Sequence, residues 1–293
     1  MTLPLPVPAL DHVVIGLRTE LDAGAERFRR LGFTLTPRGV HTLGSVNHLA
    51  VFATDYLELL AVPEGETRRP EILVAPRGLN AMVFATEDAD AVHAALVAAG
   101  LPAGPAEQFS RPVALEPGLA RAATFRTVRL PTDATAAGRL YFCQHLTRDL
   151  VWRDAWRRHP NAAAGVDRIV IAAADPARLC ALFARMFGAD AVRTDAAGGT
   201  LALGLARCEI RTPEALRQEF GAAAPALDGR GDGRPDGRPD GRVEAMAVLG
   251  LRSLDPDRTQ AVLAAGGIPY RRETDRIVVA PAEACGVTLE FVG

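Results

Sequence analysis

Four segments of the chain repeat one pattern, and this repeat constrains the fold more than any other feature of the sequence. Each segment opens with a polar residue and a short apolar run that is typical of a strand. A loop with Asp or Thr follows, then an Ala- and Leu-rich stretch of helical period, and then a glycine suited to end a helix. The segments begin at Asp11, Asn80, Asp167 and Glu244, and their glycines are Gly32, Gly100, Gly188 and Gly266.

After its glycine, each unit continues into further strand-like stretches and ends on an apolar strand. The closing strands are expected at residues 56–62, 139–145, 207–213 and 287–293. Each unit is therefore predicted as strand–helix–strand–strand–strand, which makes the chain an α+β protein of four tandem βαβββ modules.

Two regions interrupt the repeat and set the domain organisation. Residues 147–164 are predicted to form a helical connector, on which Trp152 and Trp156 are four positions apart and share a helix face as an aromatic anchor. Residues 228–242 repeat Gly, Pro, Asp and Arg, cannot build a core, and are predicted to be a flexible loop. The first domain is then expected over residues 1–146, with modules 11–62 and 78–146, and the second over residues 165–293.

Composition excludes several classes of function. The formal net charge is −2 and only 5% of the residues are aromatic, so neither a basic field nor stacking surfaces for nucleic acid are expected. All 33 basic residues are arginine, which excludes a Schiff-base lysine and a phosphate-loop lysine. No signal peptide or membrane-spanning run is recognised. The four cysteines form no CxxC pair, so we expect free thiols and a cytoplasmic location. The expected partner is a small-molecule substrate, and no membrane partner is expected.

Several motifs resemble one superfamily. These are "LDHVVIGL" at residues 10–17, "HTLGSVNHLAVF" with "DYLELL" at 41–60, and "CQHLTRDLVWR" at 143–153. Together with the tandem βαβββ units, they resemble the vicinal oxygen chelate superfamily, and most closely its bacterial glyoxalase-like domain proteins. The resemblance is densest over residues 10–165. It implies that pairs of modules curve into two half-barrel cups, and that a cup holds a divalent metal such as Fe, Mn, Ni or Zn.

The resemblance also implies that the ligands lie on the first and last strand of each module. In the first module these positions carry His12 and Glu58, which are therefore the expected metal ligands. The other modules depart from the pattern. Their residues at the His12 position are Ala81, Arg168 and Ala245, and those at the Glu58 position are Tyr141, Glu209 and Glu290. A surviving metal site would therefore lie in the first half and need a third ligand from elsewhere.

The candidates for that ligand, or for a general base, are His48 and His145, because mixed imidazole and carboxylate sets suit these metals. Tyr141 is a candidate weak acid or hydrogen-bond donor. Substrate contacts are expected from Asn47, Ser45, His41 and Tyr56. An arginine inside the cup would pair with an anionic substrate, and the candidates are Arg111, Arg121 and Arg126. His93 and His159 are expected to face solvent.

The leading hypothesis is a metal-dependent lyase or isomerase, in which the metal chelates two adjacent oxygens of a small substrate and stabilises an enolate or oxyanion. One alternative is a metal-free protein that binds and sequesters a small molecule. Another is an extradiol-type, ring-cleaving dioxygenase. The second half is expected to be structural, either closing the cup or forming the surface of a homodimer.

Overall fold

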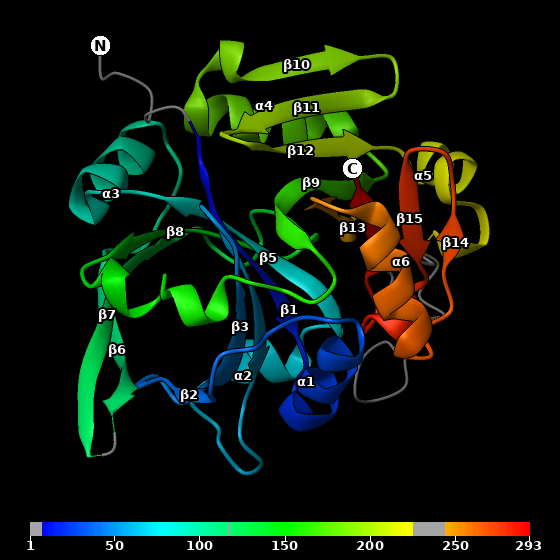
Figure 1. Cartoon of the computed structure of the whole chain (residues 1–293). Coiled ribbons are helices and arrows are strands. Elements are labelled where there is room, and N and C mark those ends of the chain that lie inside the picture. The colour runs from blue at the N-terminus through cyan, green and yellow to red at the C-terminus, as the bar shows by residue number, and fades with distance from the viewer. Residues whose placement is uncertain (1–7, 117, 225–243) are drawn as a thin grey trace.

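The computed structural model of the protein describes residues 8–116, 118–224 and 244–293. Within these ranges the four predicted units are formed, each from one strand, one helix and three further strands (Figure 1). The predicted loop 228–242 lies outside the described residues. In the part of the chain that is described, no helix is long and apolar enough to cross a membrane.

The first half contains two units and a short linking helix. Unit one comprises β1 (Leu10–Gly16), α1 (Leu21–Arg30), β2 (Gly39–Val40), β3 (Val46–Val51) and β4 (Tyr56–Ala61). After α2 (Pro70–Val74), unit two comprises β5 (Gly78–Ala85), α3 (Ala89–Ala98), β6 (Glu107–Glu116), β7 (Leu119–Arg129) and β8 (Arg139–His145).

The second half repeats this plan. Unit three comprises β9 (Ala163–Ala173), α4 (Pro176–Phe187), β10 (Val192–Asp195), β11 (Gly198–Leu203) and β12 (Ala206–Arg211). After α5 (Pro213–Phe220), unit four comprises β13 (Glu244–Ser253), α6 (Pro256–Ala265), β14 (Arg271–Arg272), β15 (Arg276–Val279) and β16 (Thr288–Val292).

Each half is one eight-stranded sheet, in which two units meet along their first strands. The strand orders are β2-β3-β4-β1-β5-β8-β7-β6 and β10-β11-β12-β9-β13-β16-β15-β14. In both sheets the first strands of the two units are antiparallel, and each first strand runs parallel to the last strand of its own unit. The predicted α+β fold with paired, curved sheets is confirmed, and Figure 1 shows the two halves meeting along β5 and β13.

The helix ends follow the predicted signals. Asp88, Asp175 and Asp255 cap α3, α4 and α6 by accepting a hydrogen bond from a backbone N–H three residues on. The predicted glycines of the first three units adopt a left-handed backbone, which a residue with a Cβ adopts only under strain. In the fourth unit the left-handed position is Gly267, one residue after the predicted glycine.

The two faces of the first sheet have different surroundings. One face packs with α1, α3 and the second half in a single apolar core that contains Val13, Ile15, Leu57 and Leu59. The opposite, concave face carries Val14 and a separate apolar cluster. We call the space above this face the first cup.

The segment after β8 closes one end of the first cup. It forms two 3₁₀ turns, Arg148–Leu150 and Asp154–Trp156, so the prediction of one connecting helix is wrong. The aromatic anchor is present, because Trp152 lies edge-on to Tyr56 with ring centroids 5.5 Å apart. His159 was expected to face solvent, but it is buried, and its Nε2 donates a hydrogen bond to the Val51 carbonyl at 3.0 Å.

Candidate functional site

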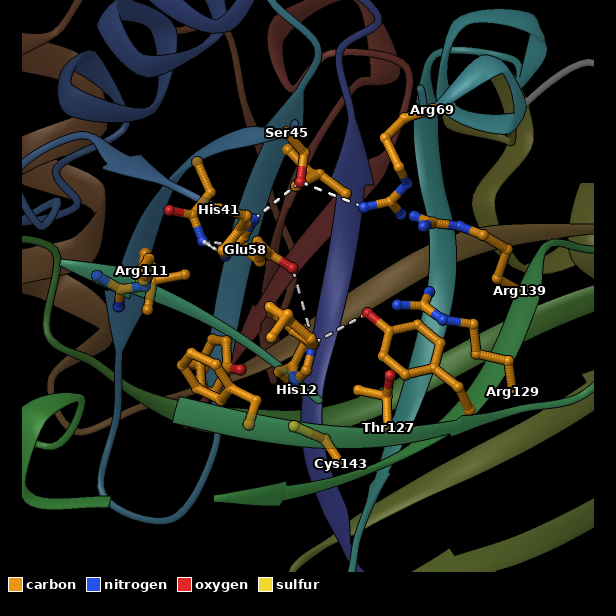
Figure 2. A pocket seen from close by; sticks show the side chains of 17 residues that line it. His12, His41, Ser45, Glu58, Arg69, Arg111, Thr127, Arg129, Arg139 and Cys143 are labelled. Atoms are coloured by element: carbon orange, nitrogen blue, oxygen red, sulfur yellow. Dashed lines mark hydrogen bonds and ion pairs between the residues drawn. The ribbon is translucent and has the colours of Figure 1, made fainter. Parts of the chain in front are cut away.

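The first cup contains a narrow cavity of about 40 Å³, enough for a few water molecules or a small organic group. Strand register brings most of the predicted site residues to it. The predicted residues that line the cavity are His12, His41, Ser45, Asn47, Tyr56, Glu58 and Tyr141 (Figure 2).

Asp11 and His12 form a buried pair at the start of β1. The pairing of β1 with β5 is irregular between Leu10 and His12. At this irregularity the side chains of Asp11 and His12, which are adjacent in sequence, contact each other. His12 Nδ1 lies 2.5 Å from Asp11 Oδ1, and the imidazole stacks on Tyr56 with centroids 4.3 Å apart. Because Nδ1 donates to the carboxylate, Nε2 presents its lone pair to the cavity. The Tyr141 hydroxyl, 3.2 Å away, donates to it.

A hydrogen-bonded chain holds Glu58 opposite His12. Glu58 Oε2 lies 3.7 Å from His12 Nε2, and Glu58 Oε1 accepts a hydrogen bond from the Asn47 amide at 2.6 Å. The same amide nitrogen donates to His41 Nε2 at 3.3 Å, and His41 Nδ1 donates to Ser45 Oγ at 2.8 Å. These hydrogen bonds fix the orientation of Glu58 and leave Asn47 Oδ1 without a partner among the described residues.

Acidification is expected to destabilise the protein through His41. Burial lowers the pKa of His41 from 6.5 to about 4, although the charge of Glu58 opposes this change. Between these values the unfolded chain binds a proton that the folded chain excludes, so stability falls as the pH falls from 6.5 to 4. The loss is about 3 kcal/mol over that window. Urea unfolding at pH 7 and pH 4.5 should show a smaller loss in His41→Asn than in the unaltered protein. An identical loss in both proteins would contradict the assignment.

His48 does not belong to the site. Its register partner is Leu59, which faces the apolar core, whereas its neighbours Asn47 and Leu49 face the cup with Glu58. Its Nδ1 donates to the Thr36 carbonyl at 2.7 Å. Alternate residues of a strand point to opposite faces, so the predicted role of His48 as a metal ligand or base is wrong.

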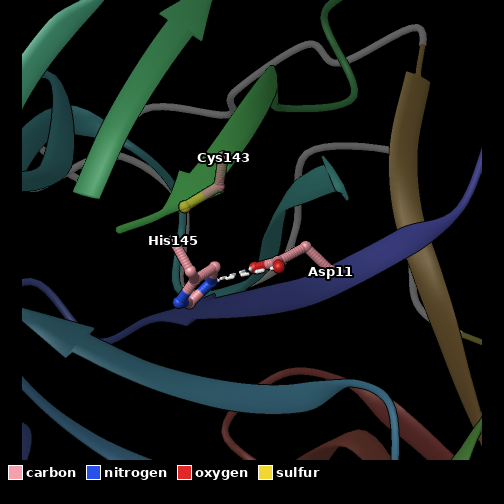
Figure 3. A group of neighbouring side chains, drawn as sticks. All are labelled: Asp11, Cys143 and His145. Carbon is pink, nitrogen blue, oxygen red and sulfur yellow. Dashed lines mark hydrogen bonds and ion pairs between the residues drawn. The ribbon is translucent and has the colours of Figure 1, made fainter. Parts of the chain in front are cut away.

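His145 lies beside the site, in contact with Asp11 and with the rings of Tyr56 and Phe125. Its Nε2 lies 3.1 Å from the Asp11 carboxylate, at the end of the cup, and it does not line the cavity. Asp11, Cys143 and His145 place possible metal-binding atoms within 4.8 Å of one another (Figure 3). However, both histidines already donate to Asp11, and burial raises the pKa of the Cys143 thiol well above its usual value. Asp11 and His145 therefore form a hydrogen-bonded support for His12.

Arginines that the sequence did not single out lie around the cavity. Of the three arginine candidates, Arg111 lines it, whereas Arg121 and Arg126 pair with acidic residues outside it. Arg111 is 3% exposed, and its Nη2 has no hydrogen-bond partner among the described residues. The other lining residues missed from sequence include Arg69, which precedes α2, and Thr127, Arg129 and Arg139, whose positions depend on how unit two curves.

We call the space over the corresponding face of the second sheet the second cup, and it contains an ion-pair cluster. Arg168, at the position of His12, donates through Nη2 to Glu290 Oε2 at 2.9 Å and through Nη1 to Glu209 Oε2 at 3.3 Å. The register confirms the matches of Glu209 and Glu290 to Glu58. In unit four, however, the residue matching His12 is Val248 rather than the predicted Ala245. The reason is that β13 begins at Glu244, four residues before the matching position, whereas β1 begins at Leu10, two residues before His12. A guanidinium thus occupies the centre of the second cup.

The donor set of the first cup does not fit a usual catalytic metal centre. Such centres take three protein ligands. The cup offers His12 Nε2 and Glu58 Oε2, while the matching positions of unit two carry Ala81 and Tyr141. Burial raises the pKa of the Tyr141 hydroxyl, so it stays a neutral phenol. Two donors beside the buried cation of Arg111 make a weak site for a second cation.

Comparisons with known proteins agree with this architecture. A hypothetical protein from Staphylococcus aureus has a TM-score of 0.64 at 13% identity, over 97% of this chain and 99% of that chain. A 4-hydroxymandelate synthase variant from Streptomyces coelicolor has a TM-score of 0.56 at 11% identity, over 98% and 93%. A fusion of a xylose isomerase-like TIM barrel with 4-hydroxyphenylpyruvate dioxygenase has a TM-score of 0.56 at 14% identity. The match covers 99% of this chain and 49% of the fusion. These identities show a shared fold alone.

The paired βαβββ units and the cup that they enclose define a protein of the vicinal oxygen chelate superfamily. A search of curated proteins finds no match. A family model described as a glyoxalase-like domain matches residues 10–187, which is more than half of the chain. The protein therefore belongs to the glyoxalase-like domain family, and the matched region contains the whole first cup.

Proposed function

We propose that the first cup binds a small oxygenated organic anion and catalyses proton transfer at the carbon next to its carbonyl group. The observation that carries this proposal is a set of buried polar atoms around His12. Arg111, Asn47 and Thr127 line the cavity, and Arg111 Nη2, Asn47 Oδ1 and Thr127 Oγ1 are buried without a hydrogen-bond partner among the described residues. Each such atom is costly to bury unsatisfied, so a polar, negatively charged ligand is expected to complete the set.

In the proposed reaction the substrate displaces the Tyr141 hydroxyl from Nε2 of His12, and His12 then acts as the general base. Its Nε2 takes a proton from the substrate carbon, and the electron pair of the broken C–H bond moves to the carbonyl oxygen as an enolate. The charge of Arg111 stabilises that oxyanion, while Asp11 and Glu58 stabilise the imidazolium. If the deprotonated carbon carries a hydroxyl group, the proton returns to the former carbonyl carbon while the hydroxyl proton moves to the former carbonyl oxygen, which gives an isomerisation. If the carbon on its other side carries a leaving group, the enolate re-forms the carbonyl and expels that group with its bonding electron pair, which leaves a carbon–carbon double bond and gives a lyase reaction.

The metal-dependent form of this function has less support. A bound ion would supply the positive charge that Arg111 supplies here, but only His12 and Glu58 would hold it. The extradiol alternative requires two histidines and a carboxylate. Ala81 stands where the second histidine would be needed, and His48 faces the other side of the sheet.

The experiment is a screen of small 2-oxo and 2-hydroxy carboxylates on chelator-treated protein. A ligand is expected to raise the melting temperature of the unaltered protein, and the matched variant Arg111→Met should lose that rise. Proton NMR in D₂O then follows exchange at the carbon beside the carbonyl. Exchange without metal supports the proposal.

Three other outcomes would overturn the proposal. Exchange that appears only with Fe, Mn, Ni or Zn would establish the metal-dependent enzyme. A bound ligand without exchange would establish the metal-free binding protein. Stabilisation that Arg111→Met retains would show that the ligand binds elsewhere.

We also propose a cytoplasmic location. The support is that all four cysteines are free and buried, as is usual in a reducing compartment.

A further inference from the structure

A second, larger cavity of about 550 Å³ lies next to the cavity of the first cup. The two cavities share Arg69, Arg129, Arg139 and Tyr141, so one elongated ligand could occupy both. We call the larger cavity the vestibule. Its charged lining residues are Arg68, Arg69, Arg129, Arg139, Glu71 and Glu107. Cations exceed anions by two among these residues, in a protein whose overall net charge is −2. Arg68 and Arg69 are ion-paired with Glu66 and Glu71, so the less closely paired cations are Arg129 and Arg139.

Arg139 is the centre of this cationic group. Its guanidinium is partly buried, and it donates to the neutral Asn80 Oδ1 at 3.1 Å. No carboxylate of the described residues lies within ion-pair distance of it. Arg129 is only loosely paired, with its Nε 3.7 Å from Glu107 Oε2, and its guanidinium lies over the Tyr141 ring. A partly buried cation without a counter-ion is a binding position for an anion.

The cationic groups lie on both sides of the proposed catalytic residues. Figure 2 shows Arg111 on one side of His12 and Glu58, and Arg69, Arg129 and Arg139 grouped on the other. Arg69 also connects the vestibule to the hydrogen-bonded chain that ends at Ser45, since its Nη1 donates to Ser45 Oγ at 3.4 Å. A ligand that extends past His12 therefore meets a guanidinium at each end.

We propose that the ligand is a dianion, with one oxyanion group beside Arg111 and a second, terminal carboxylate or phosphate-like group in the vestibule on Arg139, Arg129 and Arg69. This inference rests on the proposed function of the first cup and adds the chemical class of its substrate. Carboxylate and phosphate each present a pair of oxygen atoms that one guanidinium can bind with two parallel hydrogen bonds.

The test measures binding by calorimetry in three proteins. The probes are linear dicarboxylates from malonate to adipate, the monocarboxylates of the same lengths, and the matching phosphonocarboxylates. Arg139→Met removes the vestibule cation. Arg126→Met is the control, because Arg126 lies on β7 but pairs with Asp90 at 2.8 Å outside the cup.

Arg139→Met is expected to weaken one dicarboxylate or phosphonocarboxylate about 10- to 100-fold. It should leave the matching monocarboxylate unchanged, and Arg126→Met should leave both unchanged. The tighter of the two dianion series identifies the terminal group. Equal affinity of the unaltered protein for mono- and dianions would overturn the dianion inference while the proposed function stands. Binding of none of the probes, together with no hit in the oxo-acid screen, would overturn both.

Discussion

Replacing Arg168 by methionine is expected to lower the free energy of unfolding by about 3 kcal/mol or more. Arg168 forms ion pairs with three carboxylates in the second cup, those of Glu209, Glu219 and Glu290. Glu290 is fully buried, so removing its main partner leaves a charge that water cannot reach. Arg276, 3.1 Å from Glu290, offsets only part of that loss.

Urea unfolding at pH 7 measures this effect. Arg126→Met serves as the matched control, because its pair with Asp90 is screened by solvent and is expected to contribute little to stability. Adding Glu290→Gln to Arg168→Met should recover part of the lost stability. If Arg168→Met unfolds at the same urea concentration as the control, the cluster does not stabilise the second half.

Replacing His12 by glutamine is expected to slow substrate proton exchange by about 10²- to 10⁴-fold. Glutamine keeps a polar side chain of similar reach but cannot accept the proton. Asp11→Asn should also slow exchange, since the Asp11 carboxylate orients His12 and stabilises its protonated form. Substrate affinity should change much less, because Arg111 and the vestibule arginines remain.

Exchange rates by NMR, together with the affinity from calorimetry, separate these two effects. His48→Gln is the matched control, since this buried histidine lies in the same sheet but on the face away from the cup. Its exchange rate per folded molecule should match that of the unaltered protein. Undiminished exchange in His12→Gln would assign the base to another residue, with Glu58 the nearest candidate.

The strand and helix order could be predicted because each unit carries its own local signals. An apolar strand, a helix of regular period and a glycine recur in each unit, and an Asp cap recurs in units two, three and four. The strand register confirms that Ala81 and Arg168 occupy the position of His12 in their units. Ala245 does not occupy that position in unit four. The start of β13 lies directly after residues 225–243, where the sequence has no periodic signal to fix it.

The candidate site was less predictable, because it depends on which face each strand turns toward the cup. His48 illustrates this point: one position along β3 separates it from the cup-facing Asn47. Arg139 and Arg129 illustrate the converse, since their closeness depends on the pairing of β7 with β8 and on the curvature of unit two. Neither property has a local sequence signature.

The cluster around Arg168 also bears on how the second domain keeps its fold without a bound ion. The central cation of the second cup is part of the polypeptide, so it can be neither released nor removed by a chelator. Glu209 and Glu290 stand at the two positions that match Glu58, whereas the first cup has a carboxylate at one of its two matching positions and Tyr141 at the other. A single substitution, Arg168→His, would therefore give the second cup one imidazole and two carboxylates at these positions, a set that the first cup does not have.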